Sequence, residues 1–214
     1  MQILQISSVK IPDTAQSYKL RRKFMSHADG LIHADLHTSN IMASRDKMKV
    51  IDMEFAFMGP FGYDLGYLVG NLISQYCAAC FKRFPSEQNR KQFKAYLLAT
   101  IKSLIETYMK TFTLCWERSV KERYRGQQGL LQSILQEVMV DMPGYASMVN
   151  WFRSVSDIPY PDFDVIENKD AKRNATVLSL MIDWGIMFGR YKYQSADDLI
   201  ETIIGIEEEF RKSL

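Results

Sequence analysis

Five residues that can do chemistry lie close together in the sequence. His33, Asp35 and Asn40 fall in the segment HADLHTSNIM, and Asp52 and Glu54 follow in VIDMEFAF. Magnesium binds oxygen ligands, and it usually takes one or two carboxylates from a protein while it keeps several waters. A further carboxylate can accept the proton of a hydroxyl group. The residue types therefore favour the transfer of a phosphoryl group to an alcohol with the help of a metal ion.

The spacing of these residues predicts a role for each of them. Asp35 and Asn40 stand five positions apart, as do the catalytic Asp and the metal-binding Asn of protein kinases, and Asp52 follows on an expected strand. We predict that Asp35 accepts the proton of the acceptor hydroxyl and that Asn40 and Asp52 bind magnesium. Glu54 is predicted as a further ligand, because side chains at i and i+2 of an extended segment point the same way. His33 is expected to support the loop through hydrogen bonds.

A helix and a hairpin are expected to position these groups. Residues 13–28 have the apolar spacing of an amphipathic helix. Residues 40–43 and 48–52 flank a polar turn and are expected to form a small hairpin. Neighbouring antiparallel strands lie about 5 Å apart, so this hairpin brings Asn40 and Asp52 near each other.

The rest of the chain is expected to be mainly helical. Residues 142–163 contain several Pro and Gly residues and are predicted to be irregular, and Ser195 and Asp198 have the spacing of a capping box. No repeat or domain boundary is visible, so residues 1–214 are predicted to form a single, mainly α domain with a small hairpin. The helices are predicted over residues 63–83, 87–112, 127–141, 167–190 and 196–212.

Composition narrows the classes of function. The net charge of +2 comes from 27 basic and 25 acidic residues, which gives no broad field for nucleic acid. Three cysteines are too few for a disulfide framework and favour a reducing, cytoplasmic location. Cys77 and Cys80 lie within an apolar helix and are expected to be core residues. No stretch approaches the roughly 20 apolar residues that span a bilayer, so no membrane partner is expected.

The motifs resemble the C-terminal lobe of the methylthioribose kinases, within the aminoglycoside phosphotransferase and choline kinase group of the protein-kinase-like α+β fold. HADLHTSNIM and VIDMEFAFMGPFGYDLGYLVGNLI carry the resemblance, which covers about residues 13–84. It implies ATP as co-substrate, Mg2+ as cofactor and a methylthioribose-like sugar of methionine salvage as acceptor. It also implies that His33, Asn40 and Asp64 help to bind the nucleotide, and that Asp64 receives backbone donors from the catalytic loop. Kinases that this chain resembles can be homodimers.

Two features depart from that family. Asp183-Trp184 stands where the methylthioribose kinases have a pair of adjacent arginines that helps form the acceptor site. Kinases of this fold also have an N-terminal nucleotide lobe of roughly a hundred residues, whereas about 30 residues precede His33. The N-terminal lobe is therefore expected to be missing. A fragment, a truncated gene model and a degenerate protein are the open explanations. His37 can contact the substrate or cap the loop.

Three functions follow from these observations. The first is an ATP-dependent kinase of a small-molecule alcohol, above all of methylthioribose, present as a C-terminal lobe. The second is a binding module that keeps the kinase-like fold without catalysis, and the third is a kinase of another small sugar or amino alcohol. Without a nucleotide lobe, we expect the chain on its own to turn over ATP negligibly.

Overall fold

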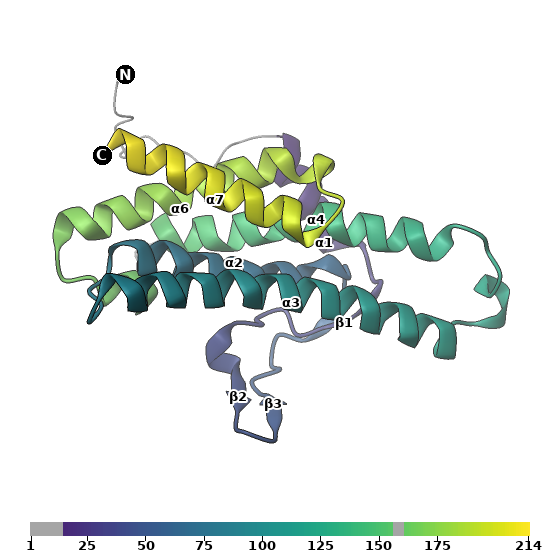
Figure 1. The fold of residues 1–214 in the computed structure, drawn as a ribbon. Helices are drawn as coiled ribbons and strands as arrows, with labels where there is room; N and C mark the ends of the chain where they lie inside the picture. The colour runs from purple at the N-terminus through teal and green to yellow at the C-terminus, as the bar shows by residue number, and fades with distance from the viewer. Residues whose placement is uncertain (1–14, 156–160) are drawn as a thin grey trace.

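The computed structural model describes residues 15–155 and 161–214, and most of these are helical (Figure 1). The prediction of a mainly α fold with a small hairpin is confirmed. The elements, in chain order, are α1 (Ala15–Ser26), β1 (Gly30–Ile32), η2 (Thr38–Asn40), β2 (Ile41–Ala43), β3 (Met48–Val50), β4 (Phe57–Gly59), α2 (Gly62–Phe81), α3 (Glu87–Ser119), η3 (Glu122–Tyr124), α4 (Leu130–Val155), α5 (Pro161–Asp164), α6 (Lys169–Gly189), η4 (Arg190–Lys192) and α7 (Ala196–Ser213).

The core of the molecule is built around α2. This helix is apolar on almost all sides, as expected of a helix that other helices surround, and it packs against α3, α4 and α6 (Figure 1). Val69, Ile73 and Cys77 of α2 are completely buried in this cluster. Burial of such side chains stabilises a fold by about 1.5–3 kcal/mol each. The helices therefore form a packed support for the segment that lies against the other side of α2.

The prediction that residues 142–163 are irregular is wrong over most of its length. α4 continues through Pro143 and Gly144 to Val155, and α5 begins at Pro161, while residues 156–160 lie outside the described ranges. Close packing between helices explains why the helix continues. A Cβ atom on Gly66 of α2 would lie 2.6 Å from the carbonyl oxygen of Met142. The packing of α4 against α2 stabilises the helix by more than is lost with the backbone hydrogen bond that Pro143 removes.

The other predicted helices are confirmed, with shifted ends. α3 runs to Ser119, seven residues beyond its predicted end, and begins after Ser86, whose side chain accepts a hydrogen bond from the backbone N–H of Asn89. α7 begins with the predicted capping box, in which Ser195 and Asp198 each accept a backbone N–H of the other. Caps of this kind are worth about 1 kcal/mol. None of the helices in the described ranges combines the length and the apolar character needed to cross a membrane.

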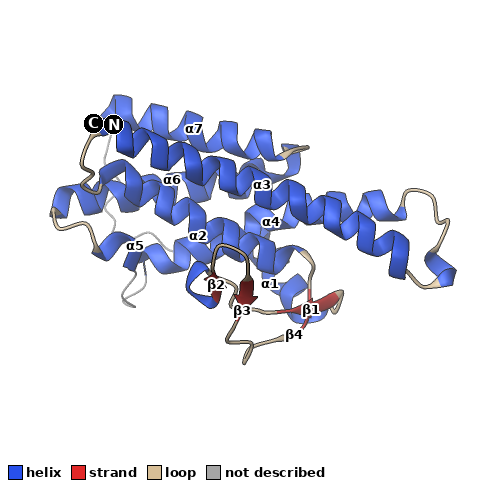
Figure 2. Cartoon of the chain, turned by 60° about the horizontal axis from the view of Figure 1, so that its bottom comes forward, coloured by secondary structure: helices blue, strands red, loops and turns tan. Residues whose placement is uncertain are grey.

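Two small antiparallel sheets lie on one side of the helices (Figure 2). β2 and β3 form the predicted hairpin, with Ile41 opposite Val50, and this hairpin projects away from the bundle (Figure 1). β1 pairs with β4, with Gly30 opposite Gly59. This second pairing was not predicted, because strands of three residues separated by 24 others leave no periodic pattern in the sequence. It closes the intervening segment into a loop against α2.

α1 is fixed to α4 by charge and by apolar contact. Lys23 forms ion pairs with Glu137 and Asp141, and Leu20 packs against Tyr145. The Lys23 and Asp141 side chains are only 13% and 11% exposed, so solvent screens this pair less than a surface pair. α1 therefore forms one wall beside β4.

Candidate active site

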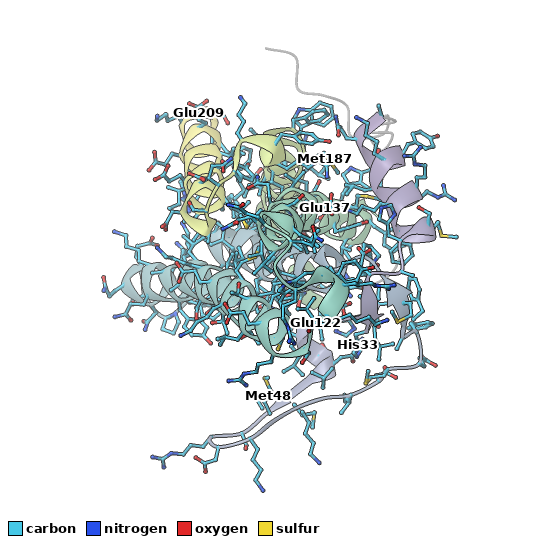
Figure 3. All side chains as sticks on the ribbon, turned by 90° about the vertical axis from the view of Figure 1, so that its right-hand side faces the viewer. His33, Met48, Glu122, Glu137, Met187 and Glu209 are labelled. Carbon is cyan, nitrogen blue, oxygen red and sulfur yellow. The ribbon has the colours of Figure 1, made fainter. Side chains whose placement is uncertain are left out.

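The hairpin brings Asn40 and Asp52 to neighbouring positions. The backbone N–H of Ile51 donates to the carbonyl oxygen of Asn40 at 3.0 Å, which extends the β2–β3 ladder by one step. Asn40 thus lies opposite Ile51, and Asp52 is the next residue. His33 joins the same place, because its Nε2 lies 2.8 Å from the carbonyl oxygen of Ile51. Figure 3 shows His33 near the helices and Met48 farther out on the hairpin.

The segment after Asp52 does not have the extended geometry that the sequence suggested. Asp52 has a φ of 65°, in the left-handed region, and the backbone N–H of Ala56 bonds the carbonyl oxygen of Met53 at 3.1 Å. Glu54 lies in that turn and is exposed. The argument that Asp52 and Glu54 face the same way as positions i and i+2 of a strand is therefore wrong. The chain has to turn here to enter β4, which accounts for the difference.

The imidazole of His33 joins the backbone of its own loop to the end of the hairpin. It is buried, and its Nδ1 accepts the backbone N–H of Asp35 at 3.3 Å. Because a carbonyl oxygen can only accept, Nε2 must carry the hydrogen that it donates to Ile51. Both ring nitrogens are thus engaged, which suits the supporting role expected for His33.

Asp64 at the start of α2 holds the backbone of the same loop. Its carboxylate accepts the N–H groups of His33 at 2.6 Å and of Ala34 at 2.9 Å, so the backbone donors expected at Asp64 are present. Burial raises the pKa of the Asp64 carboxyl, and these two hydrogen bonds oppose the rise. Ala34 has a φ of 66°, which costs a residue other than Gly about 1–2 kcal/mol. The two hydrogen bonds help to hold this strained backbone.

Three further side chains of α2 bind the loop, and the sequence analysis missed them. Tyr67 donates to Oδ1 of Asp35 at 2.7 Å, and Asn71 accepts both the backbone N–H and the hydroxyl of Thr38, at 3.1 and 2.7 Å. Gln75 lies 3.3 Å from the same hydroxyl. Together with Asp64 they form a polar stripe at positions 64, 67, 71 and 75, which lie on one face of a helix. Polar residues at this spacing in an otherwise apolar helix were the available signal.

Asp35 is surrounded by donors rather than by other carboxylates. Nδ2 of Asn40 lies 3.1 Å from its main-chain oxygen and 3.5 Å from its Oδ2. Nε2 of His37 lies 3.4 Å from Oδ2. Burial lowers the pKa of the His37 imidazole, so the ring is mostly neutral at pH 7. Asp35 and Asn40 are thus brought together, as their spacing predicted, and His37 lies beside both.

The residues at the hairpin suit a hard divalent cation. Because Asn40 donates through Nδ2, its Oδ1 is the atom that can ligate a metal, and the exposed Asp52 directly follows Ile51, the residue opposite Asn40. Two oxygen donors of this type are what magnesium takes from a protein. In the described part of the chain, no three His, Cys, Asp or Glu side chains group as a metal cluster. The roles of Asp52 and Glu54 as ligands stay predictions.

Asp183 and Trp184 are not arranged as a substrate-binding pair. The Asp183 side chain is 1% exposed and accepts a hydrogen bond from Nδ2 of Asn150 at 2.7 Å, within the bundle core. Trp184 is 54% exposed and packs against Phe188. α6 therefore turns these neighbouring residues to opposite environments.

Comparison with known proteins agrees with the residues that form this site. Residues 9–104 match the APH model, the phosphotransferase enzyme family. The methylthioribose kinase of Geobacillus thermodenitrificans (strain NG80-2) is 31% identical over 192 residues, which are 90% of this chain and 46% of that protein. That of Exiguobacterium sibiricum is 35% identical over 128 residues, 60% of this chain and 30% of that protein. That of Pectobacterium atrosepticum is 31% identical over 153 residues, 72% of this chain and 38% of that protein.

The chain spans less than half the length of each of these relatives. The match to the family model includes Asp35, Asn40, Asp52 and Asp64. The resemblance read from the two motifs is confirmed. Residues 9–104 match the model of the phosphotransferase enzyme family, and the chain is similar to methylthioribose kinases over most of its length.

Proposed function

We propose that this chain is the metal-binding and acceptor-binding part of an ATP-dependent phosphotransferase that acts on a small-molecule alcohol. Methylthioribose is the first acceptor to test, because the relatives carry that name. The observation that carries the proposal is the contact of Asp35 with Asn40, which itself lies opposite Ile51 in the hairpin. A candidate base and a candidate metal ligand are thereby held side by side on a supported loop.

The chemistry can be assigned residue by residue. Asp35 would orient the acceptor hydroxyl and accept its proton. Asn40, Asp52 and Glu54 would hold Mg2+, which when bound neutralises the negative charge of the phosphates. His33 and Asp64 would keep the loop in place beside the nucleotide. Catalysis of phosphoryl transfer depends mainly on such positioning and on charge stabilisation, so a rigid bundle is a suitable support.

The polypeptide for the assay is chosen by sequencing the transcript upstream of Met1. If the open reading frame continues, its full product is assayed, and if it starts at Met1, the 214-residue chain is assayed. The protein is mixed with ATP, MgCl2 and one acceptor at a time, and products are followed by 31P NMR. The acceptors are methylthioribose, ribose, an amino alcohol and an aminoglycoside.

If the reading frame extends upstream of Met1, we expect phosphorylated methylthioribose from its full product, whereas the 214-residue chain alone should turn over ATP negligibly. Asp35→Asn should lower the rate by about 100-fold or more, since general-base catalysis contributes 10²–10⁴-fold. Asp46→Asn, in the exposed turn of the hairpin, is the matched control and should keep the rate. A rate for Asp35→Asn equal to that of the unmodified protein would overturn the proposal. Binding of methylthioribose without any consumption of ATP would identify a binding module instead.

A further inference from the structure

We propose that Tyr67 and Arg153 are positioning residues that fix which oxygen of Asp35 receives the acceptor proton. The inference rests on the proposed function, because the choice of oxygen matters only if Asp35 acts as a base. It extends that function to residues on α2 and α4 that belong neither to the catalytic loop nor to the hairpin.

A chain of hydrogen bonds joins the three side chains. Nη2 of Arg153 lies 3.1 Å from the hydroxyl oxygen of Tyr67, and that hydroxyl lies 2.7 Å from Oδ1 of Asp35. The guanidinium carbon of Arg153 also lies 5.4 Å from the centre of the Tyr67 ring, within range of a cation–π contact. Arg153 stands near the end of α4, so two helices converge on one carboxylate.

The direction of these hydrogen bonds follows from the donors available. A guanidinium group has no acceptor, so Arg153 must donate to the hydroxyl oxygen of Tyr67. The single hydrogen of that hydroxyl is then directed to Asp35. Burial raises the pKa of the Tyr67 phenol, and the hydrogen bond to Asp35 raises it further, while Arg153 opposes the rise. The phenol therefore keeps its hydrogen at neutral pH and remains a donor.

The other oxygen of Asp35 faces Asn40, a predicted metal ligand, and His37. Oδ2 lies 3.5 Å from Nδ2 of Asn40 and 3.4 Å from Nε2 of His37. With Oδ1 occupied by Tyr67, the geometry assigns Oδ2 as the proton acceptor. In the transfer, the acceptor oxygen bonds the γ-phosphorus of ATP, the bond from that phosphorus to the ADP oxygen breaks, and the hydroxyl proton passes to Oδ2. Solvent then takes that proton.

Steady-state kinetics test this assignment, with Tyr67→Phe as the first variant. It keeps the ring and removes only the hydroxyl, so Asp35 should lose its orientation while the acceptor still binds. We expect kcat to fall by about 10- to 100-fold, the size of effect that a small misplacement produces, with the acceptor KM changed by less than about twofold. A purely structural role would not separate kcat from KM in this way.

Tyr108→Phe is the matched control. Its hydroxyl also donates one hydrogen bond from a part-buried position, to the carbonyl oxygen of Phe61 at 2.8 Å rather than to Asp35. This variant should keep kcat within about twofold of the unmodified protein, since it does not touch Asp35. At Arg153, replacement by Met should lower kcat, and Lys, which can still donate to Tyr67, should restore part of it.

The outcomes separate the two proposals. If the unmodified protein phosphorylates its acceptor and Tyr67→Phe has the same kcat, the inference fails while the proposed function stands. If the unmodified protein does not transfer a phosphoryl group, the proposed function fails and the inference falls with it. The hydrogen-bonded chain itself is read without turnover, from the 13Cζ resonance of Tyr67. That resonance should shift in both Asp35→Asn and Arg153→Met, and an unchanged resonance in both would overturn the inference.

Discussion

The carboxylate of Asp64 lies 2.6 Å from the backbone nitrogen of His33, although 31 positions separate the two residues. This hydrogen bond fixes the start of the loop at residues 33–40 to the first turn of α2. Two further residues of the polar stripe of α2, Tyr67 and Asn71, hydrogen-bond the loop at Asp35 and Thr38. The core helix α2 therefore sets the geometry of the site by holding a loop whose only helical part is the short η2 among the described residues.

Removal of the Asp64 carboxylate should loosen this loop. Asp64→Ala leaves two part-buried backbone N–H groups without their acceptor, and we expect the free energy of unfolding to fall by about 2 kcal/mol. Amide exchange at His33 and Ala34 should accelerate at the same time. Glu209→Ala, on the exposed side of α7, is the control and should change neither quantity. Unaltered protection of His33 and Ala34 would show that other contacts hold the loop.

The backbone strain at Ala34 predicts a substitution that does not destabilise. Ala34 has a φ of 66°, which Gly adopts without a steric cost. Ala34→Gly removes about 1–2 kcal/mol of strain and loses up to about 1 kcal/mol to the greater freedom of the unfolded chain. Stability in urea should therefore be unchanged or slightly higher. Ala43→Gly in β2 should lower it, and an equal loss in both variants would contradict the strain.

The buried carboxyl of Asp183 should make the free energy of unfolding fall as the pH rises. Burial raises the pKa of its carboxyl well above 3.8, and the hydrogen bond from Asn150 opposes the rise only in part. Among the described residues, its Oδ2 has no hydrogen-bond partner. A raised pKa means that the folded state binds the proton more tightly. The contribution of Asp183 is complete below its ordinary pKa and is lost as the pH rises through the folded value.

Asn does not titrate at this position. The free energy of unfolding of Asp183→Asn should therefore increase relative to that of the unmodified protein as the pH increases. The difference in the free energy of unfolding should change by at most about 1.4 kcal/mol per pH unit. Denaturation curves at pH 4, 6 and 8 measure it. A difference that is the same at all three values would mean that the carboxyl of Asp183 titrates alike in the folded and unfolded states.

The carboxyl of Glu207 should give the free energy of unfolding the opposite dependence on pH. Burial raises the pKa of its carboxyl, but hydrogen bonds from Lys94, Tyr76 and Arg211 outweigh that effect and lower the pKa to about 2. A lowered pKa gives stability that is present above the unfolded value of 4.5 and is lost as the pH falls toward 2. Glu207→Gln should therefore destabilise the protein by a few kcal/mol, about 3, at pH 7.

This loss should shrink between pH 4.5 and pH 2, where the unmodified protein loses the same interactions. Thermal unfolding of both proteins over that range provides the comparison. Lys102, whose ion pair with Asp197 is exposed, supplies the control, because Lys102→Gln should have little effect at any pH. A cost for Glu207→Gln that is as large at pH 2 as at pH 7 would contradict the ionic basis of this cluster.

Several parts of the fold could be predicted because local sequence alone determines them. The capping box at Ser195 and Asp198 and the β2–β3 hairpin depend on neighbours in the chain. The course of α4 through Pro143 could not be predicted, because it depends on close contact with Gly66 of another helix. The pairing of β1 with β4 depends likewise on contacts across the molecule.

The candidate site shows the same division. Asp35, Asn40 and Asp64 could be found from their spacing and from the motifs that contain them. Arg153 could not, because it lies 86 positions from the hydroxyl that it contacts and stands in no motif. The expected alignment of Asp52 with Glu54 failed for a different reason, since the left-handed backbone at Asp52 starts a turn where an extended segment was assumed.

We propose that Asn40 and Asp52 hold a divalent ion beside Asp35. Binding of Mn2+, a paramagnetic substitute for Mg2+, measures this most directly, by electron paramagnetic resonance of the free ion and by broadening of the NMR signals of nearby residues. We predict broadening at Asn40 and Asp35, a loss of affinity of about 10-fold or more in Asp52→Asn, and no loss in Asp46→Asn on the same hairpin. Equal Mn2+ affinity in the unmodified protein and in Asp52→Asn, with Asn40 signals unbroadened, would show that Asn40 and Asp52 do not hold the ion.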